Sequence, residues 1–271
     1  MPNADAIRWF KGEFQRRIES AIAGTPFSLD MLTAVACQET GYIWDVLRKQ
    51  NLSKNRLLGL CVGDTLDEDR GRRAFPRTKA ALLAKPRGLE MFNIARQALI
   101  DMAQYIPSYR AAARQSNKFC HGFGIFQYDL QFFLNEPDYF LEKRYADFDA
   151  CAAKAVEELS AAMKHIGWQN KASLTDMEMV GVAIAYNTGT YRPSRGLKQG
   201  HFDGRKYYGE NFFEFLRLSK TVPSPGAAPA IAAAGRGFAA LPPPAAGVLE
   251  RAPLQGRRAR EHATRALGAV D

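Results

Sequence analysis

The chain has 271 residues, of which 46% are hydrophobic and 24% are charged, and its formal net charge is +9. This composition predicts a globular protein with a sizeable core and excludes a wholly disordered chain. The positive charge predicts attraction to a polyanion, namely nucleic acid, an anionic membrane surface or a bacterial cell wall. Nucleic acid is the weakest candidate, because no basic run is interleaved with stacking aromatic residues.

The sequence also limits how the protein relates to membranes. No stretch approaches the roughly 18 apolar residues that a membrane-spanning helix needs. The first residues, Met1-Pro-Asn-Ala-Asp-Ala-Ile, lack the apolar run of a secretory leader. We therefore expect that the protein stays in the cytoplasm or leaves it by a route that requires no such leader.

The first predicted elements are two helices separated by Pro26. Residues 5–23 form the first, and Ser28 is the expected N-cap of the second. Apolar residues recur at helical spacing in the first helix, at Phe10, Phe14, Ile18 and Ile22. The second helix is expected either to run on through Leu47 or to restart after Gly41 and then reach Leu47, because Gly41 can bend or end it.

The second helix carries an acidic residue, Glu39, on an apolar stripe. The stripe is formed by Leu32, Val35 and Ala36. A carboxyl group at the end of such a stripe tends to be desolvated, which raises its pKa and keeps it protonated near neutral pH. The alternative is an ordinary glutamate that faces solvent or pairs with an arginine.

Residues 51–86 are predicted to be irregular, and their length indicates a functional segment or a flap over a groove. A short hairpin within them is the alternative, and no other strand series is evident. Further helices are predicted over residues 89–113, 147–166 and 207–218. A capping box at Ser173-x-x-Asp176 is expected to open one more helix, which runs into the third motif described below.

The composition changes near residue 222. Residues 1–222 are predicted to form one mainly α-helical domain, and residues 223–271, rich in Ala, Pro, Gly and Arg, a disordered linker or tail. A short helix near residues 257–267 is an alternative within the tail. The cysteines Cys37, Cys61, Cys120 and Cys151 form no Cys-x-x-Cys pair, so we expect buried thiols and no metal site.

Two further motifs follow Glu39. In His121-Gly-Phe-Gly-Ile-Phe-Gln-Tyr-Asp129, Gly124 permits a tight turn, and Gln127 offers a donor and an acceptor for a sugar. In Ala185-Tyr-Asn-Thr-Gly189, Tyr186 contributes a hydroxyl and Asn187 an amide, and Gly189 ends the helix. Taken singly, the first motif also fits a glycine-rich connection to a helix, and the second fits a simple helix cap.

The ordered set of three motifs resembles the goose-type lysozyme and soluble lytic transglycosylase family, and Gly122 to Asp129 is most similar to the goose-type pattern G-F-G-L-M-Q-V-D. The resemblance implies a lysozyme-like helical fold with a glycan-binding groove. It also implies cleavage of the β-1,4 bond between N-acetylmuramic acid and N-acetylglucosamine in peptidoglycan, with no cofactor and no metal. Glu39 would be the general acid, and a monomer would act on the cell wall, in the periplasm or outside the cell.

The resemblance assigns further roles residue by residue. Gly124 and Gln127 would bind the sugar, Tyr186 would hydrogen-bond near Glu39, and Asn187 would shape the same pocket. Asp129 matches one of the aspartates that are thought to position water in the goose-type hydrolases. The other aspartate position is lysine here, at Lys118, and Thr40 stands where lytic transglycosylases often have serine.

Those departures leave the chemical outcome open between hydrolysis and an anhydro sugar. Asp64 or Asp67 could supply a second carboxylate for hydrolysis. Two other functions also remain: a non-catalytic glycan-binding module on the same fold, and an enzyme that cleaves chitin or chitosan. Three hypotheses would explain how a protein without a leader reaches the wall. It is a phage lysin, it is a cargo of a contact-dependent secretion machine, or upstream sequence is missing.

Overall fold

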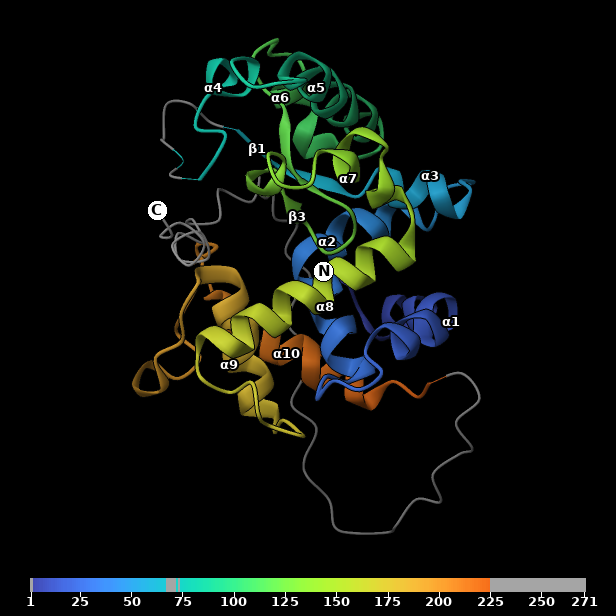
Figure 1. The fold of residues 1–271 in the computed structure, drawn as a ribbon. Coiled ribbons are helices and arrows are strands. Elements are labelled where there is room, and N and C mark those ends of the chain that lie inside the picture. The colour runs from blue at the N-terminus through green and yellow to red at the C-terminus, as the bar shows by residue number, and fades with distance from the viewer. Residues whose placement is uncertain (1, 67–71, 73, 225–271) are drawn as a thin grey trace, which may run out of the picture.

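The computed structural model describes residues 2–66, 72 and 74–224, which form a mainly helical protein with one small sheet (Figure 1). The prediction of a mainly α-helical protein is confirmed. Nearly all of the predicted disordered tail, the alternative helix at 257–267, and Asp67 lie outside the described residues.

Several helices begin and end close to their predicted bounds. They are α1 (Ala4–Ala21), α2 (Leu29–Leu47), α8 (Phe148–His165) and α10 (Tyr208–Thr221). The Ser28 hydroxyl accepts a hydrogen bond from the backbone N–H of Met31 and caps α2, as the sequence predicted. The helix continues through Gly41, where a Cβ would lie 2.5 Å from Cγ of Pro2. Gly41 thus permits close packing against Pro2, and the expectation that it ends the helix is wrong.

The helix predicted over residues 89–113 is interrupted. It is divided into α5 (Gly88–Tyr105), a 3-10 turn (Pro107–Tyr109) and α6 (Arg110–Ala113). Pro107 has no N–H to donate, and it disfavours helical geometry in the preceding Ile106, which is extended at φ −113° and ψ 96°. The proline therefore ends the helix where the apolar pattern alone would continue it.

The capping box of α9 (Asp176–Thr188) lies two residues beyond its predicted position. Thr175 caps the helix, and its hydroxyl and the side chain of Glu178 make the reciprocal hydrogen bonds. Ser173 is not the cap. The helix ends at Gly189, which adopts φ +79° as the predicted helix stop.

The sheet has three antiparallel strands in the order β1 (Val62–Thr65), β2 (Cys120–Phe123) and β3 (Tyr128–Asp129). No strand series was predicted from the sequence, so this sheet corrects the prediction. A hairpin within residues 51–86 is also wrong, because β1 pairs with residues 120–123. The flanking segments contain three short helices that were not predicted: α3 (Lys54–Gly59), α4 (Lys79–Leu83) and α7 (Pro137–Leu141).

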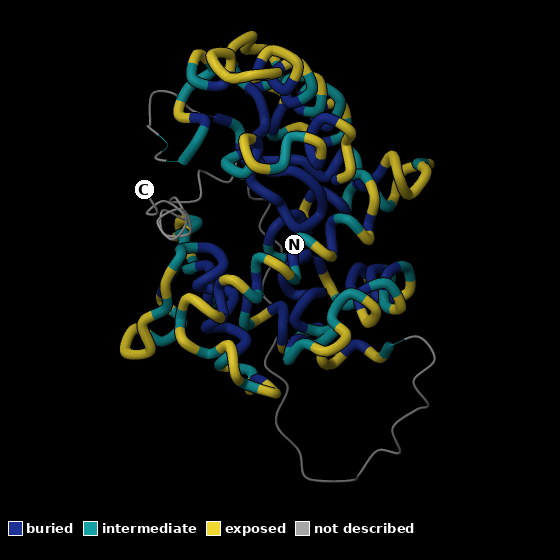
Figure 2. Tube along the Cα trace, in the orientation of Figure 1, coloured by how far each residue is buried: buried dark blue, intermediate teal, exposed yellow. Residues whose placement is uncertain are grey.

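Helix α2 lies at the centre of the molecule, with the sheet, α4, α5 and α6 on one side and α9 and α10 on the other (Figure 1). It packs against α1 and α10 and is buried over most of its length, which appears dark blue in Figure 2. Because Glu39 belongs to this helix, its backbone is fixed from several sides.

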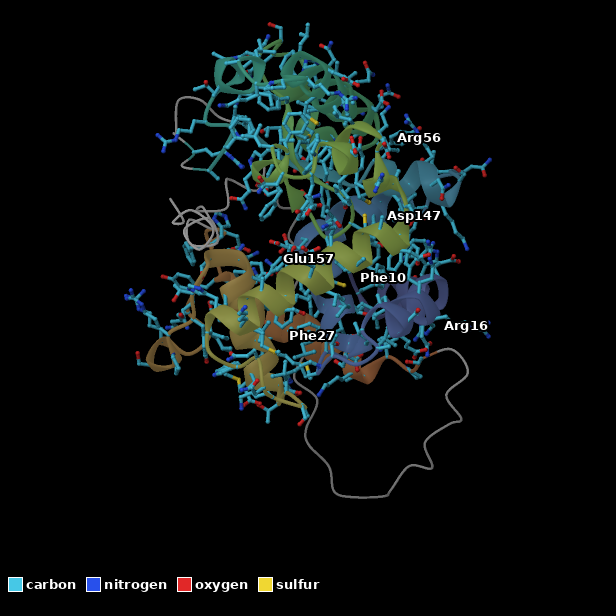
Figure 3. All side chains as sticks on the ribbon, viewed as in Figure 1. Phe10, Arg16, Phe27, Arg56, Asp147 and Glu157 are labelled. Carbon is cyan, nitrogen blue, oxygen red and sulfur yellow. The ribbon has the colours of Figure 1, made fainter. Side chains whose placement is uncertain are left out.

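Aromatic rings fill the core where α1, α2 and α8 meet. Phe14 and Phe148 stack with their centroids 4.1 Å apart, and Phe10 contacts both Phe148 and Trp44. Phe10 is fully buried, whereas Arg16 on the same helix points outward (Figure 3). The apolar stripe predicted for α1 is therefore its core-facing side.

A buried lysine secures the end of the last helix. Lys11 is 2% exposed, and its ammonium donates hydrogen bonds to Asp30 at 2.7 Å, to the Ser219 carbonyl at 2.7 Å and to the Val222 carbonyl at 2.8 Å. The charge offsets the negative pole of the helix end, and Lys11 adds a second donor to the Ser219 carbonyl, which also accepts from the Val222 N–H at 3.0 Å. The C-terminus of α10 is thus joined to α1 and α2.

The four cysteines are buried and free, which confirms the prediction of buried thiols. Burial raises the pKa of the Cys151 thiol to about 11, so it stays protonated at neutral pH. Within residues 2–66, 72 and 74–224, no helix is both long and apolar enough to span a membrane. The same residues contain no cluster of His, Cys, Asp or Glu that could hold a metal ion.

Candidate functional site

Glu39 is buried on α2, and its side chain accepts a hydrogen bond from a tyrosine. The residue is 8% exposed, and the Tyr208 hydroxyl donates to its Oε1 atom at 3.0 Å. The expectation that Glu39 ends an apolar stripe is therefore met, and the alternative of a solvent-facing glutamate is wrong. Burial beside apolar side chains disfavours the charged form of a carboxyl group.

Tyr208 is a residue of the site that the sequence did not single out. It is the first residue of α10 and is 3% exposed, and its N–H donates to the His201 carbonyl at 2.8 Å. The nearby Gly200 adopts φ +87°, and a Cβ added at Gly200 would lie 2.6 Å from the Tyr208 Cβ. The one available indication was a tyrosine pair at the start of a predicted helix, which is too common a pattern to identify a function.

The glycine-rich motif forms the turn between β2 and β3, and it contacts α2 next to Glu39. Gly124 adopts φ +76°, and a Cβ there would lie 2.5 Å from the Cys151 sulfur. The Thr40 hydroxyl donates to the Ile125 carbonyl at 2.6 Å, which ties the turn to α2. The first and second motifs are therefore brought together through a residue adjacent to Glu39.

Gln127 ends this turn in a left-handed conformation, with φ +56°. It is 3% exposed, and its amide nitrogen donates to the Gly124 carbonyl at 2.9 Å and to the Cys61 carbonyl at 3.3 Å. Its Oε1 lies close against β1 and β2. A Cβ added at Gly63 would lie 2.8 Å from this oxygen, and a Cβ added at Gly122 would lie 2.3 Å from it. The amide nitrogen thus stabilises the turn, and its use for binding sugar stays a prediction.

The third motif contacts the same turn from α9. The Tyr186 hydroxyl donates to the Phe126 carbonyl at 2.7 Å, and the residue is 2% exposed. Asn187 is 6% exposed, and its Oδ1 accepts from the N–H of His201 at 3.4 Å. All three motifs therefore meet around the turn and the start of α10, with Tyr208 donating to Glu39 and Tyr186 supporting the turn.

Asp129 lies in an ion cluster. The Arg72 guanidinium donates to both of its carboxylate oxygens, at 2.5 Å and 3.0 Å, and Nδ1 of His121 lies 3.0 Å from Oδ2. Burial on its own raises the pKa of Asp129, but the charge of Arg72 and the hydrogen bonds from His121 and Arg72 outweigh it and hold the pKa well below its usual range. These contacts favour a structural role, and a catalytic role for Asp129 stays a prediction.

Asp64 is the other described carboxyl that the sequence offered as a second catalytic group. It lies on β1, is 8% exposed and adopts φ +51°, which is uncommon for a residue with a side chain. Burial, followed by the charge of Asp64, raises the pKa of the Tyr109 hydroxyl. Asp64 therefore lies beside Tyr109, on the same strand as Gly63, against which Gln127 packs.

A small hollow lies next to the turn, lined by Phe126, Tyr128, Lys154 and Tyr186 among others. It has no space for a water molecule, and Glu39 is not among its lining residues. A sugar chain that reached Glu39 would therefore use a different surface, and this hollow takes no part in the chemistry proposed below.

The comparisons with known proteins add no relative. No protein-family model, curated protein or solved structure matches the chain. The function is therefore inferred from the three motifs and from the contacts that join them.

Proposed function

We propose that this protein cleaves the β-1,4 bond between N-acetylmuramic acid and N-acetylglucosamine in peptidoglycan, on a lysozyme-like fold. The observation that supports this most is the position of Glu39. Its carboxyl group is buried and accepts a hydrogen bond from the Tyr208 hydroxyl. The next residue, Thr40, donates a hydrogen bond to the turn of the second motif.

In this proposal, Glu39 acts first as a general acid. Its proton passes to the bridging oxygen as the bond between that oxygen and the anomeric carbon of the muramyl residue breaks. The N-acetylglucosamine leaves with a new hydroxyl group, and Glu39 becomes a carboxylate. Tyr208 donates to Oε1, so it orients the carboxyl group and then stabilises the negative charge that develops there.

The second step is proposed to use the same carboxylate as a base. The 6-hydroxyl of the muramyl residue attacks its own anomeric carbon, its proton passes to Glu39, and an anhydro sugar results. This route requires a single carboxylate. It is favoured over water attack because Asp129 is bound by Arg72 and His121, and because lysine occupies the other aspartate position.

The test is digestion of purified sacculi by the full chain and by Glu39→Gln, followed by mass spectrometry of the released muropeptides. The wild type should release products that are one water lighter than hydrolysis products, and Glu39→Gln should reduce release by about 10²- to 10⁴-fold. Glu142→Gln makes the same chemical change in an exposed ion pair with Arg144 and serves as the control.

Three outcomes would overturn parts of the proposal. Undiminished release by Glu39→Gln would reject Glu39 as the acid. Products that retain the extra water would reject the anhydro route and favour hydrolysis. Binding to sacculi without any release by the wild type would reject cleavage altogether and favour a glycan-binding module.

A further inference from the structure

The segment that leads into Tyr208 carries a pair of aromatic rings, one exposed and one half-buried. Phe202 is 49% exposed, and its ring centroid lies 4.9 Å from that of Tyr207. The two residues face each other across an isolated antiparallel bridge, so both side chains project from the same side of this hairpin. Since Tyr207 directly precedes Tyr208, the ring pair is adjacent in sequence to the residue that donates to Glu39.

Side-chain hydrogen bonds hold the backbone of this hairpin, while the Phe202 ring stays exposed. Asp203 accepts hydrogen bonds from the N–H groups of Arg205 and Lys206, both at 2.9 Å, and from the buried Asn211 side chain at 2.9 Å. A ring pair whose backbone is already ordered loses little conformational entropy when a ligand binds. A ring pair with one exposed member on a hydrogen-bonded backbone is therefore suited to binding.

The preceding loop adds exposed positive charge on a similarly fixed backbone. The buried side chain of Gln199 accepts from the Arg192 N–H at 2.9 Å and donates to the carbonyls of Arg192, at 2.9 Å, and Gly196, at 2.7 Å. The exposed cations of this stretch are Arg192, Arg195, Lys198 and Arg205. None of them takes part in the ion pairs formed between described residues, unlike Lys206, which pairs with Glu214.

We infer that residues 192–207 form a binding surface for a glycan strand that carries carboxylates, in which Phe202 and Tyr207 contact a sugar ring and the cations contact the carboxylates. The C–H faces of a pyranose pack on the negative face of an aromatic ring, while unpaired cations favour an acidic polymer over a neutral one. This inference rests on the proposed function and deepens it, because it assigns preference for acidic peptidoglycan over neutral chitin to one segment.

The aromatic part is tested by binding of the full chain to purified sacculi in the Glu39→Gln background, where cleavage does not interfere. Phe202→Ser should weaken binding by about three- to tenfold, because one ring contact is lost. Leu134→Ser is the matched control, since Leu134 is similarly exposed at 47% and belongs to a different part of the chain. Equal affinities of the two variants would overturn the aromatic contact.

The charged part is tested with the triple variant Arg192→Gln, Arg195→Gln and Lys198→Gln. It should weaken sacculus binding by about tenfold at low salt, reduce the salt dependence of binding, and leave binding of a neutral chitin oligomer unchanged. A control triple variant with Arg16→Gln, Arg110→Gln and Arg114→Gln removes the same charge from α1 and from the region of α6. Equal losses in both triple variants would show a general charge effect and overturn this contact.

The failures of the two proposals are distinguishable. If the wild type releases muropeptides but the variants bind like their controls, only the binding surface is rejected. If the wild type neither binds nor cleaves sacculi, the proposed function fails and the inference fails with it.

Discussion

The protein buries two carboxyl groups within its motifs, and each accepts a hydrogen bond from a different kind of donor. Glu39 accepts a hydrogen bond from the neutral hydroxyl of Tyr208, whereas Asp129 accepts hydrogen bonds from the charged guanidinium of Arg72. Both are buried, at 8% and 5% exposure, yet a cation stabilises the ionised form while a hydroxyl adds no charge. Burial alone therefore does not decide the charge of a carboxyl group, and at Asp129 the Arg72 guanidinium favours the ionised form.

The largest effect on stability is expected from Asp129→Ala. It leaves the buried Arg72 without its counter-charge, which should lower the free energy of unfolding by about 3–5 kcal/mol. Urea unfolding measures this. Glu142→Ala breaks an exposed pair with Arg144 and should cost less than about 1 kcal/mol. Similar costs for the two variants would remove the distinction drawn between buried and exposed carboxylates.

The same ion cluster predicts sensitivity to acid. The native pKa of Asp129 lies below its ordinary value of 3.8, so its contribution to stability is present above that value and is lost as the pH falls through the native pKa. Unfolding measured between about pH 2 and pH 6 should show a smaller loss at low pH for Asp129→Asn than for the wild type. Parallel pH profiles would indicate that Asp129 is not held ionised by Arg72.

The close packing of the turn between β2 and β3 can be tested with a matched pair of glycines. Gly124 and Gly24 adopt φ +76° and +75°, but only at Gly124 would a Cβ clash, with the Cys151 sulfur at 2.5 Å. Both alanine variants bear the backbone cost of about 1–2 kcal/mol. Gly124→Ala should cost about 1–3 kcal/mol more from overpacking and should reduce muropeptide release per folded molecule. Equal costs in calorimetry would contradict the close packing.

The smallest effect is expected from loss of a single hydroxyl. Tyr208→Phe and Tyr186→Phe should each lower the free energy of unfolding by about 1 kcal/mol, since each loses one buried hydrogen bond. Tyr208→Phe removes a donor to Glu39, so it should reduce the turnover number by about tenfold, with a smaller change for Tyr186→Phe, whose hydroxyl donates to the Phe126 carbonyl. The reverse order would reassign the supporting role to Tyr186.

The long helices could be predicted because their stability depends on local patterns. The apolar spacing in α1 and the Ser28 cap of α2 each lie within a few residues of the helix they define. The sheet could not be predicted, because its strands are short and β1 pairs with a strand far along the chain. Pro107 was a local indication of a helix end, and the apolar pattern around it outweighed it in the prediction.

The site shows the same division between local and distant information. Glu39 was found from its apolar neighbours on one helix. Arg72 and Tyr208 each donate a hydrogen bond to one of the two carboxyl groups, and they lie 57 residues from Asp129 and 169 residues from Glu39. Sequence pattern could therefore indicate which acids are buried, while the partners that decide their ionisation required the folded chain.

The buried lysine beneath the last helix has a mechanical consequence. Lys11 holds the Ser219 and Val222 carbonyls at one end of α10, and Tyr208 occupies the other end, about 21 Å away along the 14-residue helix. A pulling load applied to the chain beyond Val222 would therefore first meet Lys11 and Asp30, not the tyrosine. The helical body could be anchored or fused at that end without displacing the donor to Glu39.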